Sequence, residues 1–159
     1  MLAVGVVASA VPGVSAAGDP VAACQQAIGK AGGALVDAVL RAEQACLQAL
    51  AQGKLEPEAR CTDRGPSTGA ITDERTLARV RGAIEKAGAA IARRCAVVDV
   101  AAPPPAGLGM PAACPWAGQS CVMRITDVSS LADCLVCAHV DAAQALVAGE
   151  YSPSLRGVP

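Results

Sequence analysis

Three side chains near the C-terminal end of the chain have the types and the spacing to do chemistry: Cys134, Cys137 and His139. Two cysteines separated by two residues are typical of thiol redox proteins, in which a helix N-terminus lowers the pKa of the reactive thiol. The same thiols, together with a histidine, could hold Cu(I) or zinc. The sequence of residues 134–139 also resembles a c-type haem attachment site. In such a site the histidine directly follows the second cysteine, whereas here Ala138 lies between Cys137 and His139.

A structural role is the interpretation that we favour for these residues. Cys134 and Cys137 fall about two turns into a segment whose spacing predicts a helix, whereas a redox pair needs the helix N-terminus. His139 is the only histidine of the chain, and the sequence contains no nucleophile–base pair and no Gly-rich phosphate loop. We therefore predict no catalytic residue, no cofactor and no metal site. Thiol redox chemistry or Cu(I)/Zn handling by Cys134, Cys137 and His139 is the alternative.

The cysteine count favours disulfides over thiol chemistry. An even number of cysteines in a chain predicted to be exported is typical of a disulfide framework. All of them are expected to be bonded: Cys24, Cys46, Cys61, Cys95, Cys114, Cys121, Cys134 and Cys137. Eight cysteines allow about 105 pairings, so the pairing has to come from the helices that carry them.

Three segments, 20–52, 72–95 and 127–148, have the apolar spacing of amphipathic helices. The first follows Asp19, a good capping residue, and stops before Gly53. The predicted apolar faces are Cys24, Ile28, Ala31, Leu35, Val39, Ala42, Cys46 and Leu50 in the first helix, Leu77, Val80, Ile84, Ala87, Ile91 and Cys95 in the second, and Leu131, Leu135, Ala138, Ala142 and Leu146 in the third.

One stretch occurs twice, once in each of the first two helices. Residues 27–35 (AIGKAGGAL) and 83–91 (AIEKAGAAI) are identical, or exchange Leu for Ile, at seven of nine positions. Because Gly and Ala let two helices approach closely, we interpret the repeat as the contact seam of an antiparallel hairpin. That seam does not explain the lysine in each copy, Lys30 and Lys86, and we expect both to extend from a solvated helix surface.

Helix geometry narrows the disulfide pairing. Cys24 and Cys46 lie about 33 Å apart along one helix, and a bridge needs Cα atoms within about 7 Å. In an antiparallel hairpin the start of the first helix meets the end of the second, which predicts a Cys24–Cys95 bridge. Cys46 then lies near Cys61 in the connecting loop. The other four cysteines would tie the Pro-rich loop 101–118 to the third helix, and their pairing stays open.

Residues 1–16 are predicted to be a signal peptide, which leaves 17–159 as one disulfide-rich helical domain. An apolar run ends at Pro12-Gly13 and a small-x-small cleavage site follows, although no Lys or Arg precedes the run. A buried N-terminal helix is the alternative for this segment. We expect the mature chain to be secreted or periplasmic.

Composition and charge argue against two classes of partner. The formal net charge is −1 at pH 7, which gives no electrostatic reason to bind nucleic acid or an anionic membrane surface. No membrane span is expected in the mature chain, because Lys30, Asp37 and Arg41 interrupt the next apolar segment. Aromatic residues make up 1% of the chain and hydrophobic residues 53%, so the core has to be built from small aliphatic side chains.

Several short segments resemble a group of Ala-rich, Cys-rich exported bacterial proteins. They are CQQAIGKAG at 24–32, ACL at 45–47, GKL at 53–55, ARRC at 92–95 and LADCLVC at 131–137, and they span nearly all of the mature chain. The resemblance implies export and a disulfide-bonded helical fold, and it implies no activity. We predict an all-α, disulfide-stabilised antiparallel helical hairpin with a third docked helix. We expect an exported non-enzymatic structural or binding protein of the cell envelope or exterior, with an unknown partner.

Overall fold

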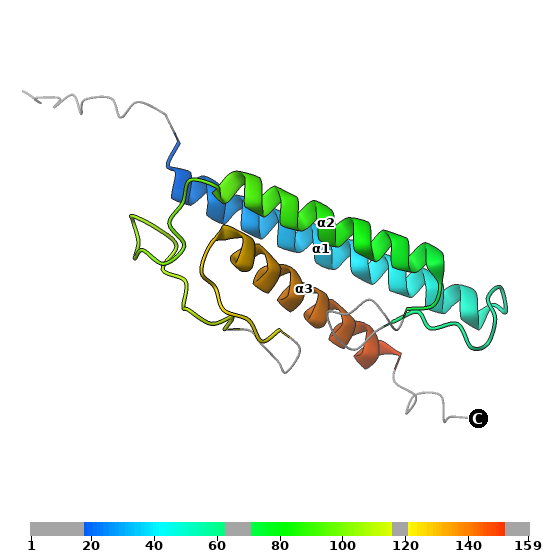
Figure 1. Ribbon diagram of the computed structural model, residues 1–159. Helices are drawn as coiled ribbons and strands as arrows, with labels where there is room; N and C mark the ends of the chain where they lie inside the picture. Colours follow the sequence, from blue (N-terminus) through cyan, green and yellow to red (C-terminus); the bar gives the residue numbers. More distant parts are fainter. Residues whose placement is uncertain (1–17, 63–70, 116–120, 152–159) are drawn as a thin grey trace, which may run out of the picture.

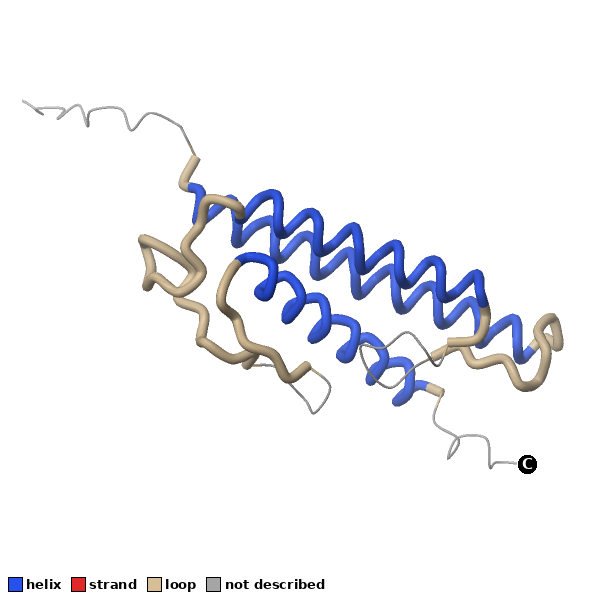
Figure 2. The backbone as a smooth tube through the Cα atoms, in the orientation of Figure 1, coloured by secondary structure: helices blue, strands red, loops and turns tan. Residues whose placement is uncertain are grey.

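Three helices make up the computed structural model, which describes residues 18–62, 71–115 and 121–151. The helices are α1 (Pro20–Ala51), α2 (Glu74–Cys95) and α3 (Val128–Glu150). α1 and α2 lie side by side and antiparallel, and α3 packs against both of them, running in the same direction as α1 (Figure 1). Loops join the helices, and the described ranges contain no strand (Figure 2). The predicted all-α hairpin with a third docked helix is therefore confirmed.

The helices start at acidic capping residues. Asp19, Asp73 and Asp127 accept hydrogen bonds from backbone N–H groups two or three residues ahead, at 2.8 to 2.9 Å, and so satisfy donors that a helix start leaves unpaired. At the end of α1, Gly53 has a φ of +66°, in the left-handed region that a glycine adopts without a steric penalty. Local sequence thus sets the helix bounds to within about two residues of those predicted.

The first two helices bury the faces that their spacing predicts. α1 contributes Leu35, Val39 and Ala42, and α2 contributes Val80 and Ile91, each with at most 2% of its surface exposed. None of these side chains is aromatic, so the hairpin core consists of small aliphatic groups. Such a core lets the helices lie close together, and disulfides add to its stability.

The third helix is rotated from the face predicted for it. Leu131 and Leu135 are buried, but Leu146 is 56% exposed, and Ala142 is also exposed. The core side of the C-terminal half is formed instead by Val140, Ala143, Gln144 and Val147. The prediction was wrong in this half because α3 is apolar on most of its circumference, so spacing alone does not select the buried face.

We overlooked in the sequence one described segment that passes a first test for crossing a membrane. α3 is long and apolar enough to cross one, by length and composition. Half of its most apolar stretch is buried inside the bundle, and the buried core helix of a globular protein passes the same test. Its two cysteines are bridged to Cys114 and Cys121 in the preceding loop. The packing of half of this stretch inside the bundle is one reason for its hydropathy.

Four disulfides tie the bundle together. Cys24 is bonded to Cys95 and Cys46 to Cys61, the two bridges that helix geometry predicts. The pairs left open are Cys114–Cys134 and Cys121–Cys137. Four intramolecular disulfides are consistent with an oxidising, extracytoplasmic environment. The predicted signal peptide, residues 1–16, lies outside the described residues.

Candidate functional site

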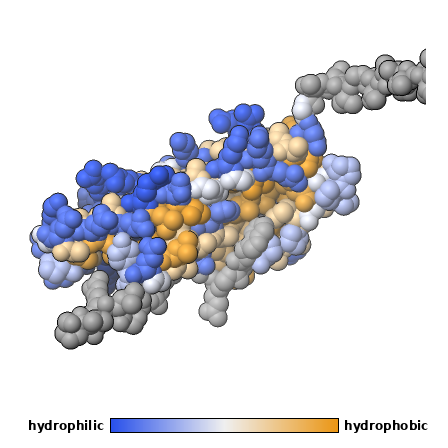
Figure 3. All heavy atoms as spheres, turned by 180° about the vertical axis from the view of Figure 1, so that it is seen from behind, coloured by the Kyte–Doolittle hydropathy of each residue, from blue (hydrophilic) through white to orange (hydrophobic). Residues whose placement is uncertain are grey.

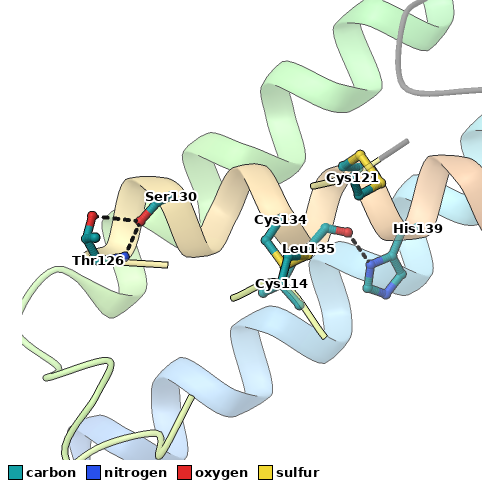
Figure 4. Close-up of a disulfide and its surroundings, with 8 residues drawn as sticks. Cys114, Cys121, Thr126, Ser130, Cys134, Leu135 and His139 are labelled. Carbon is teal, nitrogen blue, oxygen red and sulfur yellow. Dashed lines mark hydrogen bonds between the residues drawn. A yellow bond between two sulfur atoms is a disulfide. The ribbon is translucent and has the colours of Figure 1, made fainter. Parts of the chain in front are cut away.

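The two cysteines of the Cys-x-x-Cys motif belong to different disulfides. Cys134 is bonded to Cys114, and Cys137, one turn further along α3, is bonded to Cys121 (Figure 4). Both residues are buried, with 0% and 5% of their surface exposed. The structure therefore uses the motif to fix the loop before α3 at two consecutive turns, and the two sulfurs do not form a redox pair with each other.

His139, the third residue of the predicted chemical cluster, packs between helices. Its Nδ1 lies 2.6 Å from the carbonyl oxygen of Leu135 (Figure 4), so Nδ1 carries the hydrogen and donates, because a carbonyl oxygen only accepts. The other side of the ring lies against Gly32 of α1, where a Cβ would collide with it. Among the described residues, no group of three or more His, Cys, Asp or Glu side chains is placed to hold a metal.

A buried polar pair joins α1 to α3 near the far end of the bundle. Glu43 has no exposed surface, and its Oε1 accepts a hydrogen bond of 3.2 Å from Nε2 of Gln144, which is 3% exposed. We did not predict this pair from the sequence. The signal was available, because Glu43 follows Val39 and Gln144 follows Val140 by four residues, on the faces that those valines bury.

The opposite side of the hairpin is open, and a groove runs along it between α1 and α2. The groove has a volume of about 450 Å³, within the range of small-molecule sites. Alanines form most of its lining: Ala23, Ala27, Ala31, Ala34, Ala38, Ala83, Ala87 and Ala90. Because most of them belong to the two copies of the repeat or lie within four residues of one, the repeated stretch supplies both walls.

Four basic side chains accompany these alanines. Lys30 extends from α1, while Lys86, Arg93 and Arg94 extend from α2, and all four are exposed. No acidic side chain is among the described residues that line the groove. Seen from behind, the molecule has hydrophobic patches below a row of hydrophilic atoms on its upper edge (Figure 3). The two lysines left unexplained by the sequence thus point to the same groove.

The glycines of the repeat have a different role from the one predicted. Gly32 faces His139 of α3, whereas a Cβ at Gly29, Gly33 or Gly88 would meet no atom within 4 Å. The glycines therefore do not form the contact between α1 and α2. The alanines do lie along that contact, where Ala31 and Ala87 are buried.

The lining of the groove offers groups that bind rather than groups that react in concert. Methyl groups cover its floor, and ammonium and guanidinium groups stand beside them. Such a site can desolvate an apolar ligand and attract negative charge. Comparison of the chain with protein-family models, with curated proteins and with solved structures gave no match.

Proposed function

We propose that this protein is an exported, non-enzymatic binding protein of the cell envelope or exterior, and that the α1–α2 groove is its binding site for an apolar ligand. One observation carries the proposal. Two copies of one stretch, on two antiparallel helices, supply opposite walls of a single groove of about 450 Å³. On this open face, methyl groups of the alanines are left in contact with water, and an apolar ligand would cover them.

The disulfides support a binding role because they hold the walls of the groove without a ligand. Cys24–Cys95 joins α1 to α2 at one end, with Cα atoms 4.8 Å apart. Cys46–Cys61 fixes the loop beyond the other end. A site that is formed before the ligand arrives loses less conformational entropy on binding. Disulfides of this kind also fit a protein that acts in an oxidising compartment.

The alternative, thiol redox chemistry or metal handling, has less support. It needs free thiols at Cys134 and Cys137, and both sulfurs are engaged in separate, buried disulfides. Either function would first require reduction of the bridges that anchor the loop before α3.

Titration with Nile red, an uncharged fluorescent probe of apolar sites, tests the proposal. The wild-type protein is expected to bind one probe with a blue-shifted, saturable emission. Ala34→Trp places an indole on the exposed part of the groove floor and is expected to abolish that binding. The matched control is Ala145→Trp, which adds the same side chain at an exposed position of α3, away from the groove.

Circular dichroism and thermal unfolding establish that both variants are folded. Saturable binding that is lost in Ala34→Trp and kept in Ala145→Trp supports the groove as the site. Absence of saturable binding to the folded wild type, or equal binding by both variants, would overturn the proposal.

A further inference from the structure

We infer, on the basis of the proposed function, that the ligand of the groove is a long-chain carboxylate, bound with its anionic group beside Arg93, Arg94 and Lys30 and its hydrocarbon chain directed toward Ala38. The inference rests on how charge is distributed along the groove.

The disulfide Cys24–Cys95 defines one end of the groove, from which positions along it can be counted. Arg93 and Arg94 lie within two residues of this end. Lys30 lies six residues along α1, about 9 Å from the end at 1.5 Å per residue. The three cations nearest the disulfide therefore come from both helices and lie in the half of the groove that is nearer to it.

The far end of the groove is apolar. Lys86 is about 14 Å from the disulfide end, and beyond it the lining continues through Ala83 to Ala38, about 21 Å from the same end. Lysine stems cover apolar surface while their ammonium groups stay in water, so Lys86 can flank a hydrocarbon chain. The result is an apolar trough whose described lining carries no cation beyond Lys86, on the side toward Ala38.

The charged residues beside the apolar end form an ion pair. Asp37 directly precedes Ala38 at the apolar end and pairs with Arg41 at 3.3 Å, on the exposed surface of α1. A ligand whose anionic group lay at this end would meet no cation of the described lining and only a carboxylate that is already paired, whereas the reverse orientation places it among three cations. Opposite charges attract at a surface, so the cations favour the orientation in which the anionic group lies beside Arg93 and Arg94.

The lining residues and the volume of the groove favour a single-chain ligand over a protein partner. Protein interfaces are enriched in Tyr, Trp, Met and Arg, with large buried anchors at their centre. The described residues of the lining include two arginines but no aromatic side chain and no Met. Its volume lies in the range of small-molecule sites. A second copy of the chain or an acidic helix is the competing occupant, and the test includes it.

Displacement of bound Nile red by two single-chain compounds of equal length tests the inference. Dodecanoate is anionic and dodecylammonium is cationic, and both are used below the concentrations at which they form micelles. Dodecanoate is expected to displace the probe from the wild type at a concentration about tenfold lower, as two or three surface charge contacts would give. The Arg93→Glu/Arg94→Glu variant is expected to lose this preference, with each displacement measured relative to the affinity of the same variant for Nile red.

The matched control is Arg75→Glu/Arg79→Glu, which makes the same change of charge on α2 outside the groove. It is expected to keep the preference for dodecanoate. Equal displacement by the two compounds, or loss of the preference in both variants, would overturn the inference and leave the proposed function standing. Failure of Nile red to bind at all would overturn the proposed function itself. A concentration-dependent dimer in sedimentation that is absent in Arg93→Glu/Arg94→Glu, without displacement by dodecanoate, would assign the groove to a second copy and refute the inference.

Discussion

The two faces of the α1–α2 hairpin are built differently, although the same two helices form both. One face is covered by α3 and holds specific contacts, such as the Glu43–Gln144 hydrogen bond and the fit of His139 against Gly32. The other face is open, and the groove along it is lined mostly by alanines with basic side chains beside them. On α1, Gly32 and Ala34 are two residues apart and point about 160° from each other.

This difference separates what stabilises the fold from what remains available for a ligand. Side chains on the covered face are constrained by a neighbour, so substitutions there should change the free energy of unfolding. Side chains on the open face have no such neighbour, so substitutions there should change binding and leave stability nearly unaltered. Matched pairs of variants on α1 can test this separation.

The largest effect is expected from Glu43→Ala. The substitution removes a buried side chain together with its hydrogen bond from Nε2 of Gln144, so the free energy of unfolding should fall by about 3 kcal/mol. The control on the opposite face is Arg41→Ala, which removes an exposed ion pair with Asp37 and should cost less than about 0.5 kcal/mol. Urea unfolding followed by circular dichroism measures both. Equal losses in the two variants would contradict the separation of the faces.

Replacing either of two neighbouring glycines by alanine is expected to change the free energy of unfolding by a smaller amount, and the two changes should have opposite signs. The methyl group added by Gly33→Ala would meet no atom within 4 Å. The substitution should therefore stabilise the protein by about 1 kcal/mol through helix propensity alone. Gly32→Ala gains the same propensity but must displace the ring of His139, at a cost of about 2 kcal/mol, for a net loss of about 1 kcal/mol. Thermal unfolding of both variants measures the difference. Its disappearance in a His139→Ala background would identify the ring as the cause, and its persistence there would argue against this contact.

The smallest effect concerns the pH dependence of the helix that covers the closed face. Asp127 caps α3, and hydrogen bonds from the backbone N–H and then the hydroxyl of Ser130 hold the pKa of its carboxyl below the ordinary value of 3.8. Because this pKa is lower in the folded state, the stabilisation is complete at neutral pH and is lost as the pH falls through the folded-state pKa.

Asp127→Asn keeps a capping oxygen but cannot titrate. The urea midpoint of the wild type should therefore fall more steeply than that of the variant as the pH is lowered from neutral to below 3.8. Nile red binding at neutral pH should be the same in both proteins, because α3 lies on the closed face. Parallel pH profiles would show that the cap does not contribute in this way.

Much of the fold could be predicted because its determinants are local. Capping acids and apolar spacing set the three helices, and the rise per residue was sufficient to pair Cys24 with Cys95 and Cys46 with Cys61. Local rules of this kind could not show which cysteines Cys134 and Cys137 are bonded to, and so could not decide between structural disulfides and reactive thiols. Which cysteine each one meets depends on how the loop before α3 returns to that helix, and loop paths are not encoded by periodicity.

The candidate site was only half visible in the sequence. The repeat identified the stretches that form both walls of the groove, but we interpreted its lysines as solvated surface and its glycines as the hairpin contact. Their surroundings depend on where the other helices lie. A Cβ at Gly32 would meet the ring of His139 on α3, whereas a Cβ at Gly33 would meet no atom within 4 Å. No property of a single helix distinguishes two adjacent glycines in this way.

The sequence by itself determined the helices, the antiparallel hairpin and two of its four disulfides, because propensity, capping and helix length act within a few turns of the chain. Only the tertiary structure decided the rotation of α3, the burial of Glu43 against Gln144 and the convergence of Lys30, Lys86, Arg93 and Arg94 on one groove. These features depend on the relative rotation and register of packed helices. That geometry is fixed by the sum of many contacts between segments that lie far apart in the chain.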